Sequence, residues 1–157
     1  MTRTEPTIRL GRVEESDAIA ELFERIRQQT LEDGSIPQGI HTLDEHRVWV
    51  RERLFGEQEV WVAERDGELV GFMVLGRPDW LEHLYLDRAA TGAGLGSRFV
   101  ELAKAELAGP IQLWTFQSNT GAQRFYARHG FVPVQWTDGD NEEQAPDVRL
   151  VFTPPPT

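Results

Sequence analysis

The stretch that decides the fold runs Leu84-Tyr85-Leu86-Asp87-Arg88-Ala89-Ala90-Thr91-Gly92-Ala93-Gly94-Leu95-Gly96-Ser97. An apolar strand ends at Leu86, a short connection follows, and three glycines at alternate positions open a helix. Glycine lets the backbone approach a ligand closely, and the free N–H groups of a first helical turn favour an anion. The stretch therefore predicts a phosphate- or pyrophosphate-binding turn. The competing interpretation is a plain turn, because glycines also begin helices for packing reasons alone.

The glycine spacing differs from that of both common nucleotide loops. A P-loop requires Lys and then Ser or Thr after its last glycine, and here Ser97 and Arg98 follow Gly96. A dinucleotide fingerprint reads G-x-G-x-x-G, whereas this turn reads G-x-G-x-G. A nucleotide-binding module is therefore the weaker alternative.

A second informative segment runs Asn119-Thr120-Gly121-Ala122-Gln123-Arg124-Phe125-Tyr126-Ala127-Arg128-His129-Gly130-Phe131. It indicates a strand end, a short helix and a glycine stop, with Asn119 and Tyr126 seven residues apart on one side of the helix. Together the two segments resemble the acetyl-coenzyme A motifs of the GNAT superfamily of N-acetyltransferases. The order of elements extends this resemblance over most of the chain, but its specific residues lie between Leu84 and Phe131.

The resemblance implies a place for each part of acetyl-coenzyme A. The pantetheine arm would meet the backbone of Leu84, Tyr85 and Leu86, and the pyrophosphate would lie in the turn formed by Gly92, Ala93, Gly94, Leu95, Gly96 and Ser97. Asn119 and Tyr126 match the family's asparagine and tyrosine. Tyr126 would donate a proton to the leaving thiolate, since a tyrosine is protonated at neutral pH. The family usually opens its turn with Gln or Arg, whereas this chain has Thr91. Arg98 and Arg128 are further candidates to meet the phosphates.

The group that would take the proton from the amine is less defined. Some relatives use a carboxylate on the strand before the glycine turn, where this chain has Glu82. Strand alternation puts Glu82 on the face of Leu84 and His83 on the opposite face. Other relatives have a carboxylate five residues before the asparagine, where this chain has Trp114. The competing interpretation of Glu82 is a solvated strand carboxylate, and a water chain or an amine of low pKa would make a dedicated base unnecessary.

The family binds its acceptor at two segments that correspond here to residues 30–41 and 137–146. The second segment carries no Lys or Arg and holds Asp138, Asp140, Glu142 and Glu143. It predicts either a lid that selects an amine-bearing acceptor or a plain solvated acidic loop. Three tryptophans either line this pocket or belong to the core, as strand aromatics more often do: Trp80, Trp114 and Trp136.

The rest of the chain predicts strands at 7–13, 60–64, 69–75, 80–86, 111–116, 131–136 and 148–152, and helices at 16–29, 42–55, 92–107 and 120–129. Asp66-Gly67 predicts a tight hairpin turn, because such turns need positive φ. This order indicates an α/β (α+β) fold with a mixed, mostly antiparallel sheet of about seven strands and about four flanking helices. We expect one domain at residues 7–152, between flexible tails at 1–6 and 153–157.

Composition narrows the function classes. The 157 residues carry a net charge of −10, which argues against nucleic-acid and anionic-membrane partners and permits a cationic one. The chain has no cysteine, which excludes disulfides, thiolate metal sites and a cysteine nucleophile. No pair of histidines has the spacing of a helical metal site, so we expect no metal. No stretch predicts a membrane span or secretion signal, and we expect a cytoplasmic protein.

These features predict an N-acetyltransferase that moves an acetyl group from acetyl-coenzyme A directly to a primary amine in a ternary complex. The acceptor would be a small amine-bearing molecule, and the resemblance is compatible with a homodimer. The alternative is a catalytically weak or inactive acyl-coenzyme A sensor or partner-binding domain of the same fold. Thr91 and Trp114, where the family has other residues, keep this alternative open.

Overall fold

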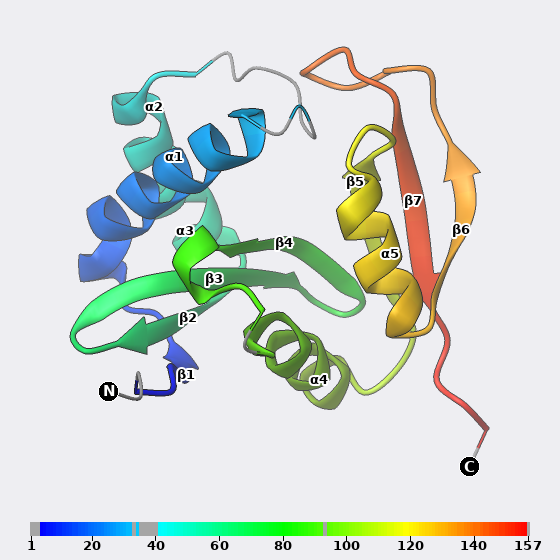
Figure 1. Cartoon of the computed structure of the whole chain (residues 1–157), viewed down its shortest axis with the longest axis horizontal. Helices are drawn as coiled ribbons and strands as arrows, with labels where there is room; N and C mark the ends of the chain where they lie inside the picture. The colour runs from blue at the N-terminus through cyan, green and yellow to red at the C-terminus, as the bar shows by residue number, and fades with distance from the viewer. Residues whose placement is uncertain (1–3, 33, 35–40, 93, 157) are drawn as a thin grey trace.

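A seven-stranded mixed sheet in the order β1-β2-β3-β4-β5-β7-β6 forms the centre of the molecule (Figure 1). The structure is a computed structural model that describes residues 4–32, 34, 41–92 and 94–156. The strands are β1 (Thr7–Leu10), β2 (Glu59–Arg65), β3 (Glu68–Gly76), β4 (Trp80–Leu86), β5 (Ile111–Phe116), β6 (Phe131–Trp136) and β7 (Asp147–Phe152). All neighbours pair antiparallel except β4 and β5, which confirms the predicted mixed sheet.

The predicted hairpin joins β2 and β3. Asp66 and Gly67 have φ angles of 53° and 83°, and Arg65 pairs with Glu68 across the turn. Positive φ at both central residues gives the turn the twist that the two strands need. The local sequence is therefore sufficient to set this part of the register.

The helices are α1 (Ser16–Glu32), α2 (Leu43–Trp49), α3 (Phe55–Glu57), α4 (Leu95–Leu107) and α5 (Thr120–Arg128), and a π-helical turn at Val50–Leu54 joins α2 to α3. The predicted capping box is present at α2, where the Thr42 side chain accepts from the Glu45 N–H and Glu45 accepts from the Thr42 N–H. The helix predicted from Gly92 begins instead at Leu95, because Gly92 and Gly94 have positive φ. At its other end the left-handed residue is Ala108, with φ of 51°, rather than Gly109.

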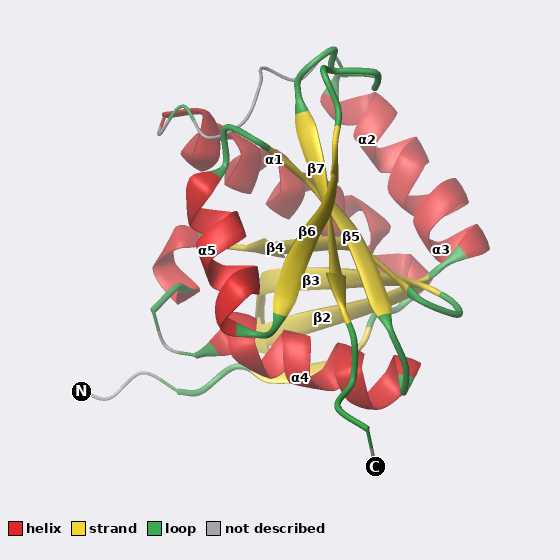
Figure 2. Ribbon diagram, turned by 90° about the vertical axis from the view of Figure 1, so that its right-hand side faces the viewer, coloured by secondary structure: helices red, strands yellow, loops and turns green. Residues whose placement is uncertain are grey.

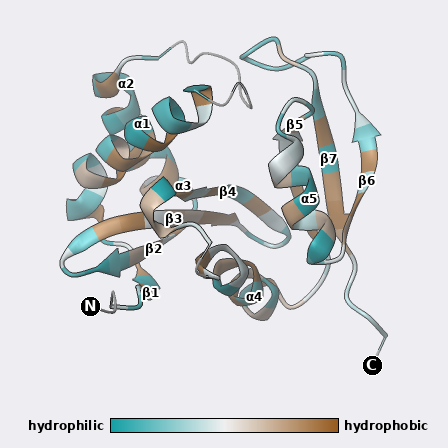
Figure 3. Cartoon of the chain, viewed as in Figure 1, coloured by the Kyte–Doolittle hydropathy of each residue, from teal (hydrophilic) through white to brown (hydrophobic). Residues whose placement is uncertain are grey.

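Two hydrophobic clusters lie on opposite faces of the sheet (Figure 2). One joins the sheet to α4 and α5 and includes Phe99, Leu113 and Tyr126. The other joins β2 and β3 to α1 and the α2 segment and includes Phe23 and Phe72. In Figure 3 the hydrophobic residues follow β2, β3 and β7, and polar residues follow the outer sides of the helices.

None of the described helices is long and apolar enough to cross a membrane. The tails expected at residues 1–6 and 153–157 fall partly on residues 1–3 and 157, which lie outside the described residues.

Candidate functional site

A gap opens in the sheet between β4 and β5. Along these two strands, both fully described, the parallel ladder has a single pair, Trp80 with Gln112. Beyond it the strands β2–β4 and β5–β7 turn away from each other (Figures 1 and 2). The edge of β4 facing the gap therefore offers backbone N–H and C=O groups that no neighbouring strand pairs, and such groups accept an extended ligand readily.

A groove of about 690 Å³ follows this edge of β4. It collects most of the residues predicted to bind acetyl-coenzyme A: Leu84, Tyr85, Leu86, Gly92, Gly94, Gly96, Ser97, Asn119 and Tyr126. Leu95 does not line the groove, because its side chain is 1% exposed and packs in the core. Leu95 can contribute only its backbone there. Ala93 lies outside the described residues.

The glycine turn closes one end of the groove. Gly92 and Gly94 have φ angles of 82° and 80°, in the left-handed region that favours glycine. Gly94 is the N-cap of α4, and its carbonyl accepts the Arg98 N–H at 3.0 Å. The N–H groups of the first turn, before Arg98, therefore have no acceptor within the helix and lie at the positive end of its dipole. The turn is suited to an anion such as a pyrophosphate.

The two arginines considered for the phosphates have different environments. Arg98 donates from Nη1 to the Pro6 carbonyl at 2.9 Å and does not line the groove. Arg128 does line the groove, and its guanidinium lies 6.0 Å from the centre of the Phe125 ring. Of the two, Arg128 is therefore the one positioned to meet a bound anion.

The α5 helix presents Asn119 and Tyr126 to the same groove, as their spacing predicts. Asn119 caps the helix, since its side-chain oxygen accepts the Ala122 N–H at 3.1 Å. Tyr126 is 7% exposed and packs edge-on against Phe125 and Phe131. Burial, with a smaller effect of Tyr85, raises the pKa of the Tyr126 phenol above its ordinary value. Tyr126 is consequently a proton donor, not a phenolate, at neutral pH.

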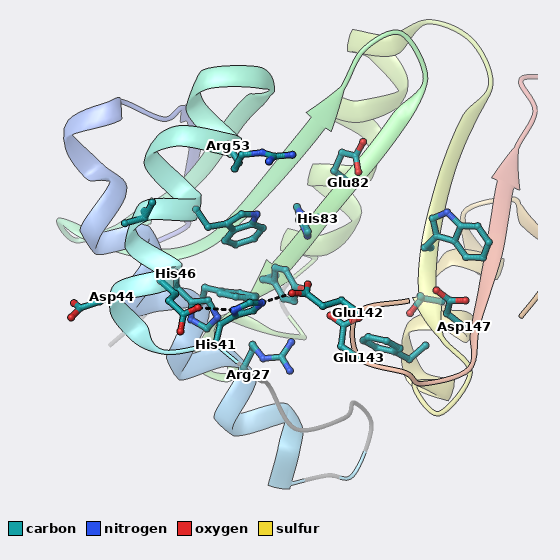
Figure 4. Close-up of a pocket in the computed structure, with 18 residues that line it drawn as sticks. Arg27, His41, Asp44, His46, Arg53, Glu82, His83, Glu142, Glu143 and Asp147 are labelled. Carbon is teal, nitrogen blue, oxygen red and sulfur yellow. Dashed lines mark hydrogen bonds and ion pairs between the residues drawn. The ribbon is translucent and has the colours of Figure 1, made fainter. Parts of the chain in front are cut away.

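A β-bulge in β4 changes the direction expected for Glu82. The β3–β4 register shifts between Val74 and Leu75, and Glu82 is the extra residue in β4. Both Glu82 and His83 therefore line one cavity on the α1 and α2 side (Figure 4). Leu84 packs against the opposite cluster. The prediction that Glu82 shares the face of Leu84 is wrong, because alternation holds only in a regularly paired strand, whereas His83 lies on the face opposite Leu84 as predicted.

Burial changes the acidity of both bulge residues. It raises the pKa of the Glu82 carboxyl, which makes this carboxylate a better proton acceptor near neutral pH. It lowers the pKa of His83 to about 4, so the imidazole is neutral at pH 7. The His83 ring lies edge-on to Trp49 at 5.1 Å and stacks with Tyr85 at 6.0 Å between centres.

The cavity that contains Glu82 and His83 has a volume of about 930 Å³ (Figure 4). Its aromatic walls come from α1, the α2 segment, β4 and β5, and include Phe23, Trp49, Tyr85, Trp114 and Phe116. Its charged lining consists of Arg27, Asp44, Glu45, Arg53, Glu82, Glu142, Glu143 and Asp147, with His41, His46 and His83. Carboxylates therefore outnumber arginines around it. Within the described ranges no group of three or more potential ligand side chains has the geometry of a metal site.

The acidic loop contributes to this cavity only in part. Glu142 and Glu143 line it, whereas Asp138 and Asp140 do not. Most of the other predicted acceptor segment, residues 30–41, lies outside the described residues, but His41 lines the cavity. We did not predict His46, Trp49 or Arg53 as site residues. The sequence of a short amphipathic helix does not show which distant part of the chain its side chains will face.

The three strand tryptophans are not core residues. Trp114 lines the cavity and is 41% exposed, and Trp136 is 60% exposed on the edge strand β6. Trp80 is partly buried and belongs to neither cluster. The interpretation as core residues is therefore wrong for all three, and Trp114 lines a pocket, which was the other interpretation.

The groove and the cavity meet at the gap between β4 and β5. They share Arg27, Glu82, His83, Tyr85, Trp114, Thr115 and Phe116 as lining residues. Ligands in the two spaces would therefore approach each other from opposite faces of the sheet. This is the geometry that direct transfer between two bound molecules requires.

The sequence profile of the Acetyltransferase (GNAT) family matches residues 19–131. The chain belongs to this family. No curated protein sequence matches it significantly. Among solved structures, a GCN5-related N-acetyltransferase from Rhodopseudomonas palustris has 22% identity and a TM-score of 0.73, with 98% of each chain covered.

Two other similar structures have ligands named with them. The yncA protein of Salmonella typhimurium, described with its cofactor acetyl-CoA, has 18% identity and a TM-score of 0.71, covering 96% of this chain and 94% of that one. The PaiA N-acetyltransferase of Thermoplasma acidophilum, in complex with coenzyme A, has 18% identity and a TM-score of 0.69, covering 96% and 99%. At these identities the likeness establishes the GNAT fold.

Proposed function

We propose that this GNAT protein transfers the acetyl group of acetyl-coenzyme A directly to a primary amine in a ternary complex. The observation that carries the proposal is the meeting of the groove and the cavity at the β4 bulge. Acetyl-coenzyme A supplies the acyl group as a thioester and would lie in the groove. The acceptor would lie in the cavity, whose excess of carboxylates favours a cationic, amine-bearing molecule.

The residues at the junction divide the proton transfers between them. Glu82, whose pKa is raised by burial, takes the proton of the acceptor ammonium, directly or through water. The neutral nitrogen then forms a C–N bond to the acyl carbon, and backbone N–H groups on the free edge of β4 stabilise the oxyanion. The nitrogen releases its second proton to water as the tetrahedral intermediate collapses to the amide. As the C–S bond breaks, Tyr126 gives its proton to sulfur and regains one from solvent. The absence of cysteine agrees with direct transfer, because no thiol could carry an acyl group.

Binding and turnover test this proposal separately. In calorimetry we expect acetyl-coenzyme A to bind and ATP and NAD to show no comparable affinity. With a panel of primary amines we expect release of free thiol and, by mass spectrometry, a product heavier by one acetyl group. Binding without release for any amine would support the sensor function instead. Preferential binding of ATP or NAD would overturn the assignment of the groove.

A further inference from the structure

His41 lies between two carboxylates that belong to different parts of the chain (Figure 4). Its Nδ1 is 3.0 Å from Glu45 Oε2 on α2, and its Nε2 is 2.5 Å from Glu142 Oε1 on the loop between β6 and β7. Glu45 is itself fixed, because its other oxygen accepts the Thr42 N–H at 3.1 Å in the capping box. His41 therefore connects the start of α2 to a loop 101 residues further along the chain.

The number of protons on His41 decides whether both contacts hold. A neutral imidazole has one N–H and one lone pair, and a carboxylate can only accept. With one proton, one of the two ring nitrogens would point its lone pair at a carboxylate oxygen. Two protons let both nitrogens donate, as charge-assisted hydrogen bonds. The observed arrangement therefore belongs to the imidazolium.

The loop on the other side of this contact is fixed at its base and within its tip. Thr137 bonds to the Asp147 side chain at the base, and Gln117 Nε2 donates to the carbonyls of both residues. Within the tip, the Asn141 side chain donates to the Ala145 carbonyl at 2.6 Å and accepts the Ala145 N–H at 3.1 Å. These bonds hold the two ends of the tip together, and the bond from His41 to Glu142 joins the tip to the residue before the N-cap of α2.

We propose that His41 is a positioning residue that, as an imidazolium, clasps the acidic loop tip against α2 and so holds Glu142 and Glu143 in the wall of the acceptor cavity. Losing the second proton releases the tip. This inference rests on the proposed function only in naming the cavity as the acceptor site.

The other groups around His41 carry both signs of charge, and the two carboxylates in contact with it favour its protonated form. The His46 ring is 6.2 Å away and bonds to Glu24 of α1 at 2.8 Å. Asp44 and Glu143 line the same cavity, where Arg27 is the nearby cation in the view of Figure 4. Glu45 first, and then Glu142, raise the pKa of His41 above its ordinary 6.5. The clasp is accordingly complete below pH 6.5 and is lost as pH rises through the raised value.

The first test needs no substrate. The imidazole signals of His41 are titrated by NMR in the wild-type chain, in Glu142→Gln, and in Glu143→Gln as the matched control from the same loop. We expect a titration midpoint above 6.5 that falls in Glu142→Gln and changes less in Glu143→Gln. Amide protection at 137–147, taken relative to the intrinsic exchange rate at each pH, should fall above that midpoint, and should be lower in His41→Gln than in the wild type below it. The clasp would be overturned by a His41 midpoint that stays the same in Glu142→Gln. It would also be overturned by loop protection that changes neither with pH nor in His41→Gln.

The second test is kinetic and uses an amine found to be a substrate. We expect His41→Gln to raise the KM of the acceptor roughly 2- to 10-fold, the range that one or two exposed ion pairs provide, with kcat and the KM of acetyl-coenzyme A unchanged. His41→Lys keeps a cation and should hold the acceptor KM low at pH values above the measured midpoint of His41, where the wild type loses the contact. Equal changes in both KM values would contradict a role at the acceptor side. Because the first test runs without turnover, a failed clasp and a failed acetyltransferase assignment give different results.

Discussion

Gly76 offers a way to move the Glu82 carboxylate without removing it. Gly76 is the last residue of β3 and pairs with Trp80, and its φ is not positive, so alanine suits its backbone. A Cβ built there would lie 2.6 Å from Glu82 Oε1 and 3.1 Å from Glu82 Cγ. Ordinary contact begins near 3.4 Å, so the carboxylate oxygen has to move by about 0.8 Å or more in Gly76→Ala.

A displacement of that size is enough to disturb proton transfer. Misplacing a reacting group by about 1 Å costs up to roughly 100-fold, and a general base contributes about 100- to 10,000-fold in total. If Glu82 is the base, Gly76→Ala should lower kcat by about 10- to 100-fold and leave the KM of acetyl-coenzyme A unchanged. The free energy of unfolding should change by no more than about 1 kcal/mol, because a flexible side chain can move aside. Thiol-release kinetics and urea denaturation measure both quantities.

Two comparisons make the test decisive. Gly56→Ala is the matched control, since a Cβ at Gly56 meets nothing within 4 Å and its φ is not positive. It should leave kcat at the wild-type value. Gly76→Ala added to Glu82→Gln should cost nothing beyond Glu82→Gln alone, because both act through one carboxylate. A wild-type kcat in Gly76→Ala, or full additivity of the two changes, would refute the assignment of Glu82 as the base.

Three further changes test other parts of the structure. Tyr126→Phe should lower kcat by about 10- to 100-fold in steady-state assays with an unchanged melting temperature, because it removes one proton donor and keeps the buried ring; an unchanged kcat would exclude Tyr126 as the acid. Arg9, mainly through its side-chain hydrogen bonds, lowers the pKa of Glu15 from 4.5 to about 2. Stability from this pair is present above pH 4.5 and lost as pH falls towards 2, so Glu15→Gln should remove about 1–3 kcal/mol of acid dependence from the unfolding free energy. If denaturation curves of the wild type and Glu15→Gln keep the same pH slope, the pair contributes nothing. Ala108→Gly should stabilise the chain by about 1 kcal/mol in calorimetry, since Ala108 has a φ of 51°, whereas Ala105→Gly within α4 should destabilise it by a similar amount. The same sign for both glycines would contradict this explanation.

Local signals in the sequence were sufficient for the elements and for part of the site. The hairpin at Asp66-Gly67, the capping box at Thr42 and the strand 80–86 occur where the sequence predicts them. The glycine turn lies at the groove, because a strand, a turn and a helix start follow each other over a short stretch of chain, and Tyr126 reaches the same groove from α5. The helix begins three residues after Gly92, since the φ of each glycine depends on the turn as a whole.

Non-local strand pairing decided which side chains of β4 and β5 line the cavity. The shift in β3–β4 register brings Glu82 and His83 to one cavity, and strand alternation within β4 alone gives the wrong face for Glu82. Trp114 lines that cavity instead of the core, because β4 and β5 separate after one pair and leave the sheet surface uncovered. Neither the register shift nor the separation of β4 from β5 can be predicted from the residues that it repositions.

The sequence by itself determined the family, the order of the strands and helices, and the turn suited to a pyrophosphate, because these depend on residues close together in the chain. Only the tertiary structure decided how the groove along β4 and the cavity beside α2 meet. It also decided that His41 joins Glu142 across 101 residues, and that the acidic loop therefore closes one side of the cavity. Such contacts depend on how β5–β7 turn away from β4, and sheet geometry is a property of paired strands, not of any one segment.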